Sequence, residues 1–320
     1  RSDAVVQGWP LGAVASYVTA SGTSAYWSET IRAEGGQYRL CWCSGRCHSA
    51  DKFRADLGSM SLIGPAPLQY ARTCISGRQC AFDGLEGEGL QVGDSIQLLN
   101  TCGTYSAAMG VPLAGSTVAL QSGTVSWGSL PITGPGGRYK LCWCSASFKC
   151  GPEEFRLEIG TLDVLGPRPL SQDRTCTSGL TCFSPRLTGH HIGLDSRVAL
   201  LSSCGVGSDS VKDEINSVEW NRGIVSAPGG QYRVCWCMPD QELDPYGNAS
   251  FRNVTDCSRW AHFQIDVGTL KVIGPAPWNQ RQTCISGQTC RLGIQGEGSL
   301  LTARVLILET CGVGATFPGG

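Results

Sequence analysis

The sequence predicts an all-β fold made of tandem immunoglobulin-like β-sandwich repeats. Each repeat is about 100 residues long, rich in disulfides, and joined to the next by a short Gly-Pro-x-Pro linker. Three observations predict this fold. One nine-residue phrase recurs with its surrounding landmarks, the apolar segments are short and bounded by turn residues, and the cysteines divide evenly among the repeats.

The recurring phrase reads GGQYRLCWC at 35–43, GGRYKLCWC at 136–144 and GGQYRVCWC at 229–237. The same landmarks flank each copy in the same order: a Trp, a Phe followed by Gly five residues later, a Gly-Pro-x-Pro, a C-x5-C and a Cys-Gly. An internal repeat decides the architecture before any local pattern is considered. We therefore expect one folding unit, written several times.

The repeat boundaries are predicted at Gly-Pro-x-Pro, because proline fixes φ, lacks an N–H donor and extends its predecessor. They give the C-terminal half of a repeat at 1–65, complete repeats at 66–167 and 168–275, and the N-terminal half of another at 276–320. The repeat at 168–275 carries an insertion near 238–256. Because the chain opens partway through a repeat and without Met, we expect a segment of a longer polypeptide.

Inside a complete repeat, apolar runs of strand length are separated by Gly, Ser, Asn and Pro, and no helical period is sustained. The strands expected in the first complete repeat are 95–99, 116–120, 123–127, 138–144 and 161–165. Gly is the most frequent turn residue, with 43 in the chain, which also favours a β-type, loop-rich fold.

Alternation along the CWC strand predicts two different faces, because successive side chains of a strand point to opposite sides. The large apolar residues share one face and form the expected repeat core: Tyr38, Trp42, Tyr139, Trp143, Tyr232 and Trp236. Both cysteines share the other face with a Lys or Arg, so we expect them to look outward or to a sheet edge and to staple loops there. The alternative is a core-spanning disulfide as in immunoglobulins, which a β-bulge would permit.

The cysteines number 18, six for each repeat, and an even repeated set predicts disulfides formed in an oxidising compartment. A zinc site is the alternative, but zinc favours C-x2-4-C pairs with His, and these spacings are C-x-C and C-x5-C. Sequence alone leaves the pairing open, with a preference for Cys144 or Cys142 closing the loop to Cys150. The expected bridge cysteines are Cys41, Cys43, Cys47, Cys74, Cys80, Cys102, Cys142, Cys144, Cys150, Cys176, Cys182, Cys204, Cys235, Cys237, Cys257, Cys284, Cys290 and Cys311.

No catalytic or metal-binding constellation is evident, so we expect no enzyme activity and no cofactor. His190 and His191 are adjacent on an expected strand and should point to opposite faces. The acidic loop from Asp240 lacks the terminal Glu of a calcium loop, with Phe251 in its place. Ser76-Gly77 and its copies have no matching His or Asp and indicate turns.

Covalent glycans are expected instead. Asn248 and Asn253 lie in N-x-[ST] sequons within the insertion, and O-glycans on Ser, Thr or hydroxyproline are an additional prediction. A net charge of -1 gives no electrostatic argument for nucleic acid. No apolar run reaches the ~18 residues that a membrane-spanning helix needs, so we expect no membrane contact from this segment.

The phrase G-G-x-Y-[RK]-[LV]-C-W-C, followed by G-x-L-x-V-x-G-P-x-P, resembles the repeat of the main protein of flagellar mastigonemes in green algae and of related protist surface proteins. The resemblance covers all three copies and implies an extracellular, glycosylated filament subunit at the cell or flagellar surface. It also implies self-association and packing along an axial hydroxyproline-rich glycoprotein. The alternative function is the ectodomain segment of a protist adhesin or receptor.

Overall fold

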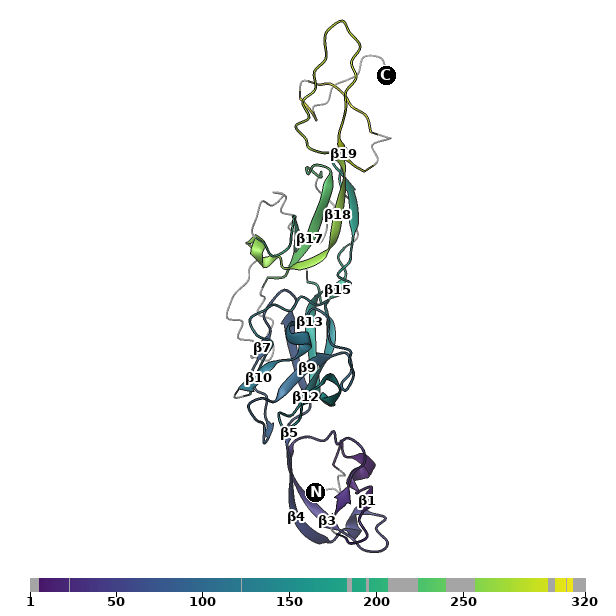
Figure 1. The fold of residues 1–320 in the computed structure, drawn as a ribbon, viewed down its shortest axis with the longest axis vertical. Coiled ribbons are helices and arrows are strands. Elements are labelled where there is room, and N and C mark those ends of the chain that lie inside the picture. The colour runs from purple at the N-terminus through teal and green to yellow at the C-terminus, as the bar shows by residue number, and fades with distance from the viewer. Residues whose placement is uncertain are drawn as a thin grey trace.

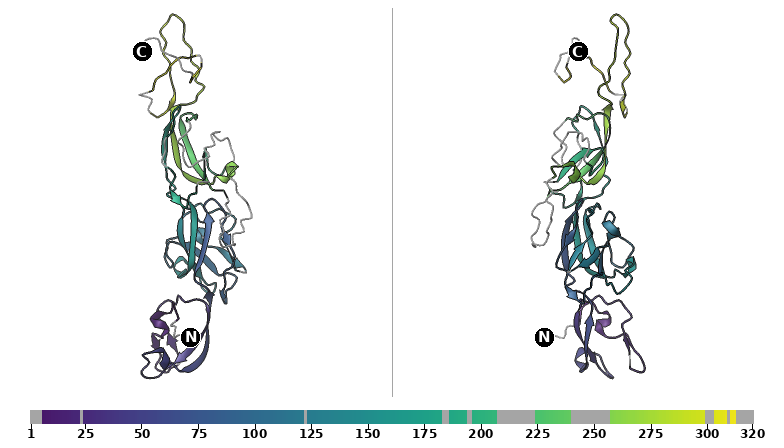
Figure 2. Two further views of the ribbon diagram at one scale, coloured as in Figure 1. Left: turned by 180° about the vertical axis from the view of Figure 1, so that it is seen from behind. Right: turned by 60° about the vertical axis from the view of Figure 1, so that its left-hand side comes forward.

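The computed structural model describes residues 6–22, 24–121, 123–182, 186–193, 196–206, 224–239, 257–298, 303–308 and 310–312. The chain is elongated, and its first and last described residues, at positions 6 and 312, lie in opposite end lobes (Figures 1 and 2). The described residues contain no α-helix, which confirms the all-β prediction. Their helical turns are all of the 3-10 type: η1 (Pro10–Ala13), η2 (Ala50–Lys52), η3 (Pro112–Gly115), η4 (Pro152–Glu154) and η5 (Trp260–His262).

The N-terminal half-unit, residues 1–65, carries small two-stranded sheets. The CWC strand pairs antiparallel with the strand that follows it, and Gly64-Pro65 forms a short strand of its own that pairs with β8 (Gly87–Glu88). Its strands are β1 (Tyr17–Val18), β2 (Ala25–Tyr26), β3 (Gly36–Trp42), β4 (Ala55–Leu62) and β5 (Gly64–Pro65).

The first complete unit, residues 66–167, is built on a mixed sheet in the order β13-β12-β9, with β6 parallel to β13, and β15 (Gly189–His190) of the next unit extends this sheet beside β13. A second sheet has the order β10-β11-β7. The strands are β6 (Tyr70–Ile75), β7 (Ala81–Phe82), β8 (Gly87–Glu88), β9 (Ser95–Leu99), β10 (Val118–Gln121), β11 (Thr124–Ser126), β12 (Gly137–Cys144) and β13 (Leu157–Pro167).

The core of this unit draws side chains from both sheets. Phe82 of β7 and Val125 of β11 lie in one buried cluster with Leu98, Leu141 and Leu162 of the larger sheet. The five segments supply short apolar runs at strand period, and burying them against each other is the main favourable term in folding.

The second complete unit, residues 168–275, repeats the larger sheet in the order β14-β18-β17-β16. The parallel pair recurs as β14 with β18, and the antiparallel neighbours of the CWC strand recur as β16 and β18. Its strands are β14 (Arg174–Thr177), β15 (Gly189–His190), β16 (Arg197–Leu201), β17 (Gly230–Cys237) and β18 (Ile265–Pro275). The C-terminal half-unit, from residue 276, contributes β19 (Gly296–Glu297).

The immunoglobulin-like sandwich is not confirmed at the level of detail that the sequence predicted. The sheets are small and open, with two to five strands each. They also contain a parallel pair in each complete unit, whereas the sheets of an immunoglobulin sandwich are antiparallel. This parallel pair forms because the C-x5-C segment at the start of a unit lies along the last strand of the same unit.

A β-bulge recurs in every copy of the CWC hairpin. From the sequence, a bulge was considered only as the feature that would permit a core-spanning disulfide. The register shifts between Leu40 and Cys41, between Leu141 and Cys142, and between Arg233 and Cys235. The glycine five residues after each Phe lies at this shift with positive φ: 119° at Gly58, 153° at Gly160 and 127° at Gly268. Glycine tolerates that conformation at little cost, which accounts for the recurring Phe-x4-Gly spacing.

None of the helical turns in the described ranges is long and apolar enough to cross a membrane. Within those ranges, no group of three or more His, Cys, Asp or Glu side chains is placed to hold a metal ion.

Candidate functional site

The CWC strand separates its apolar side chains from its cysteines, as the alternation predicts. Tyr139, Leu141 and Trp143 lie in the main core, while Cys142 and Cys144 lie in a second cluster with Leu99 and Phe155. The second complete unit has the same division between its main core and a cysteine cluster around Phe263. The cysteine face is buried beneath loops in both units, so the cysteines look away from the core without reaching solvent.

The bridges follow one rule in each complete unit. The Cys of Cys-Gly joins the first cysteine of CWC, the second cysteine of CWC joins the third cysteine, and the C-x5-C closes on itself. The eight bridges are Cys43–Cys47, Cys74–Cys80, Cys102–Cys142, Cys144–Cys150, Cys176–Cys182, Cys204–Cys235, Cys237–Cys257 and Cys284–Cys290. The bridge of Cys142 runs to the segment after the neighbouring strand β9, so it does not span the core between the two sheets.

Two of the 18 expected bridge cysteines are unbridged, which corrects the sequence prediction for them. All 18 lie in described residues, and Cys41 and Cys311 are exposed and free. The bridge rule explains both. Cys41 is the first cysteine of a CWC, and Cys311 is the cysteine of a Cys-Gly, so each is one half of the longest bridge of a unit.

The expected core role of the first-copy aromatics also needs correction. Trp42 is 53% exposed, whereas Trp143 and Trp236 are 9% and 0% exposed. Tyr38 is only partly buried. Both residues lie on the two-stranded sheet β3–β4, which has no further strands to cover them within the described residues.

The tyrosine of each copy closes the turn that leads into its strand. The hydroxyl donates to the backbone carbonyl four residues earlier: Tyr38 to Glu34 at 2.6 Å, Tyr139 to Pro135 at 2.7 Å and Tyr232 to Pro228 at 2.8 Å. Burial raises the pKa of all three tyrosines, so the hydroxyl stays a donor at neutral pH.

The Gly-Pro-x-Pro motif is hydrogen-bonded to the Gly-Gly pair at every junction. The sequence analysis did not predict this contact. The first Gly of each GG donates its N–H to the first Pro of the motif: Gly35 to Pro65 at 3.0 Å, Gly136 to Pro167 at 2.9 Å and Gly229 to Pro275 at 2.9 Å. A Cβ on these glycines would lie 1.9 to 2.1 Å from a backbone carbonyl oxygen. GG and Gly-Pro-x-Pro recur together in every copy, and this joint recurrence is the pattern from which the contact could have been predicted.

The units abut with no separate linker. The Gly-Pro of each motif is the end of a strand that pairs with the next unit along the chain: β5 with β8, β13 with β15, and β18 with β19. The Gly of the first two motifs also lies against the tryptophan of the next unit. A Cβ built on Gly64 would lie 3.8 Å from the ring of Trp143, and a Cβ built on Gly166 would lie 3.7 Å from the ring of Trp236. Backbone pairing therefore runs from unit to unit.

The Ser-Gly of the C-x5-C segment, expected as a plain turn, lies at the second junction. Ser76 Oγ donates to Gly134 O at 2.7 Å, and Gly77 N donates to Ile132 O at 2.6 Å. Arg78 Nη2 donates across the junction to the backbone carbonyl of Met238. Burial lowers the pKa of Arg78 to about 10, so its guanidinium remains charged at neutral pH.

The second junction also carries the best-defined electrostatic cluster. His190 Nε2 donates to Asp163 Oδ1 at 3.0 Å across the junction, and Arg138 Nε donates to the same oxygen at 2.9 Å. Contrary to expectation, the rings of His190 and His191 lie together, with centroids 4.4 Å apart, because His191 follows β15 with a positive φ of 49°. No metal-binding group is formed there among the described residues.

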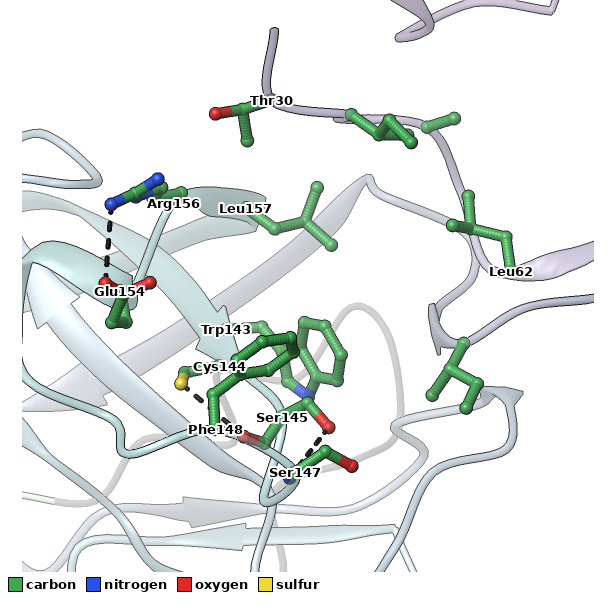
Figure 3. Close-up of a pocket in the computed structure, with 13 residues that line it drawn as sticks. Thr30, Leu62, Trp143, Cys144, Ser145, Ser147, Phe148, Glu154, Arg156 and Leu157 are labelled. Carbon is green, nitrogen blue, oxygen red and sulfur yellow. Dashed lines mark hydrogen bonds and ion pairs between the residues drawn. The ribbon is translucent and has the colours of Figure 1, made fainter. Parts of the chain in front are cut away.

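A cleft of about 530 Å³ lies at the first junction, between the N-terminal half-unit and the first complete unit (Figure 3). Thr30 and Leu62 line it from one side, and Trp143, Phe148 and Leu157 from the other. Its lining is mostly apolar, with one exposed ion pair between Arg156 and Glu154 at 3.4 Å. The predicted glycosylation residues Asn248 and Asn253, together with the acidic loop from Asp240, lie outside the described residues.

No known protein family matches the chain. The chain is similar to cysteine repeat modular protein B of Toxoplasma gondii, with 25% identity over 221 residues, which are 58% of this chain and 3% of that protein. A solved Bacteroides ovatus structure, the mixed-linkage glucan utilization locus SGBP-B with a mixed-linkage heptasaccharide, has a TM-score of 0.19 and 12% identity over 75% of this chain and 54% of its own. A TM-score of that size carries no argument about fold or ligand. The eight bridges and the Toxoplasma similarity fit an extracellular, cysteine-rich repeat protein of a protist.

Proposed function

We propose that this chain is a structural segment of an extracellular glycoprotein filament, resembling the mastigoneme type, in which bridged β units stack lengthwise and the resulting rods associate laterally. The observation that carries the proposal is the junction: at each of three places, the last strand of one unit adds to the next. Such main-chain pairing resists bending and extension better than a flexible linker does.

The bridges support the same function. Each closed loop stabilises its unit by roughly 2–4 kcal/mol, mainly by restricting the unfolded chain. A thin, loop-rich unit outside the cell depends on such constraints. N-glycans on Asn248 and Asn253, O-glycans and an axial hydroxyproline-rich glycoprotein partner belong to this proposal. The absence of enzyme activity and of a cofactor is part of it as well.

The test is electron microscopy of native, unreduced material, repeated after mild reduction. We expect regular filaments with a constant axial repeat, which fray once the bridges are reduced. Isolated rods that never associate laterally would reject the filament.

The second candidate is the ectodomain segment of a protist surface adhesin or receptor. It is favoured by the similarity to a Toxoplasma protein of which this chain covers 3%, because the matched region is a small part of a large protein whose name describes it as modular. Rods that stay separate but bind to cells or to glycans through the native chain would support it.

A further inference from the structure

The hairpin β1–β2 carries two tyrosine side chains that lie against each other on its surface. Tyr17 of β1 pairs directly with Tyr26 of β2. Their ring centroids are 6.3 Å apart with 28° between the ring planes, and the two residues are 60% and 54% exposed. Directly opposite residues of an antiparallel pair project to the same face, which is why the two rings meet.

The tyrosine pair lies on the face of the hairpin that points away from the core side. Trp27 follows Tyr26 directly, so these two side chains point to opposite faces. Trp27 lies on the core side, where its ring centroid is 5.3 Å from that of Trp9, and Trp9 in turn is 6.1 Å from Tyr38. Tyr17 and Tyr26 therefore face outward.

The first complete unit shows that this face stays open when a repeat has all its strands. Counting back from the recurring Trp, Tyr26 corresponds to Ser126 of β11. There Trp127 is buried in the core, whereas Ser126 is only partly buried and its neighbour on β7, Ala81, is exposed. The exposure of the tyrosine pair is thus a property of its face and does not depend on which strands flank the hairpin.

The other tyrosines of the described ranges are placed differently. Those whose hydroxyls are engaged in hydrogen bonds to the backbone are Tyr38, Tyr70, Tyr139 and Tyr232. Tyr105 is 73% exposed, but its hydroxyl is hydrogen-bonded to Glu153 and no aromatic ring lies beside it in the part of the chain that the structure describes. Within that part, only Tyr17 and Tyr26 combine high exposure with a second phenol in contact.

We propose that Tyr17 and Tyr26 form a site of oxidative cross-linking, at which their rings are joined carbon to carbon as a dityrosine within one chain. The hairpin contains no cysteine, so a disulfide cannot lock it, and its strands are two residues long. A two-stranded hairpin is marginally stable on its own. A covalent bond between its opposed side chains restricts the unfolded chain, as the disulfides do elsewhere in the molecule. The inference does not depend on filament formation.

The oxidant is hydrogen peroxide, acting through a haem peroxidase. Each phenol gives up one electron and one proton and becomes a phenoxyl radical, and the peroxide takes up both electrons and both protons as it becomes two water molecules. The two radicals form one bond between ring carbons next to the hydroxyl-bearing carbons, one Cε from each ring. The hydrogens on these carbons move to the oxygens, which restores both phenols. Exposed side chains change rotamer within nanoseconds, so the stacked rings can bring the two carbons into bonding contact.

The test treats the 320-residue chain, at low concentration, with hydrogen peroxide and a haem peroxidase. We expect a monomeric product with the blue fluorescence of dityrosine. The tryptic peptide that spans both residues should be lighter by two hydrogen atoms and should give no backbone fragments between Tyr17 and Tyr26. Tyr17→Phe and Tyr26→Phe should each lose the modified peptide, because Phe keeps the ring but forms no phenoxyl radical, whereas Tyr105→Phe should keep it.

A relocated phenol separates geometry from nearness in the sequence. Val18 is 54% exposed and follows Tyr17 directly, so its side chain points to the opposite face. Tyr17→Phe combined with Val18→Tyr therefore keeps two tyrosines in the segment but places them on different faces, and it should lose the cross-linked peptide. Equal cross-linking in this double variant would overturn the inference, because the stacked pair would then be unnecessary. Recovery of unmodified Tyr17 and Tyr26 from the parent chain, with or without multimers joined through Tyr105, would overturn it as well.

Discussion

A single hydroxyl group, repeated three times, fixes the entry to the CWC strand. Tyr38, Tyr139 and Tyr232 each donate to a carbonyl four residues upstream. The first Gly of GG lies inside the turn so formed, against the carbonyl of the Gly-Pro-x-Pro glycine. The turn, the strand and the junction are therefore held by contacts within a few residues of each other.

Tyr139→Phe should lower the free energy of unfolding of the first complete unit by about 1 kcal/mol, because the Pro135 carbonyl loses its donor. Equilibrium denaturation measured by tryptophan fluorescence checks this value. Tyr26→Phe is the control, since that ring is more than half exposed. Equal stability of Tyr139→Phe and the parent would show that the hydroxyl does not hold the turn.

Gly136→Ala should destabilise the same unit by about 1–3 kcal/mol, because a Cβ there would lie 2.1 Å from the backbone oxygen of Gly166. A backbone oxygen cannot move aside as a flexible side chain can. Gly151→Ala is the matched control, since a Cβ at Gly151 meets nothing within 4 Å. If both variants had the same thermal midpoint, the close approach of GG to Gly-Pro would be unimportant.

At the scale of elements, the bridges differ in how much chain they close. Cys102–Cys142 spans 40 residues and ties the segment after β9 to β12, while Cys144–Cys150 spans 6 and closes a local loop. Because the entropy lost by the unfolded chain grows with loop length, the first should contribute more to stability.

Removing Cys102–Cys142 by paired Ala substitutions should cost about 4 kcal/mol, and removing Cys144–Cys150 about 2 kcal/mol, from loop entropy alone. Denaturant unfolding of each double variant under identical conditions measures the difference. A larger loss for the short loop would mean that packing around the sulfurs, and not loop closure, determines the contribution.

The sequence predicted the elements better than their partners. The alternation of Tyr139, Leu141 and Trp143 with the cysteines is a local property, so it could be read directly from the chain. The parallel pairing of β6 with β13 joins residues about ninety positions apart, and no local pattern encodes it. The disulfide partner of Cys142 could not be predicted for the same reason, because the pairing of cysteines depends on which strands are neighbours in the sheet.

At the scale of the whole molecule, the junctions determine whether the units act as one rod. The second junction is held by the β13–β15 pairing, by the Arg78 contact to Met238, and by the carboxylate of Asp163 between Arg138 and His190. Only the Asp163 contacts depend on pH in the acidic range. Acid is therefore a selective probe of this junction.

Burial raises the pKa of Asp163, but hydrogen bonds from Arg138 and His190 outweigh it and hold the pKa below its ordinary value. A carboxyl whose folded pKa is depressed stabilises the junction above its unfolded pKa, about 3.9, and that contribution is lost as pH falls through the folded pKa. The rod should therefore become more flexible below about pH 4, which small-angle X-ray scattering would record as a shorter maximum dimension.

Asp163→Asn should show that flexibility already at pH 7 and a smaller further change in acid, whereas Glu29→Gln, on an exposed loop, should behave as the parent does. Were Asp163→Asn to stay as extended as the parent across this range, strand pairing alone would hold the second junction, and the carboxylate would have no part in the stiffness of the rod.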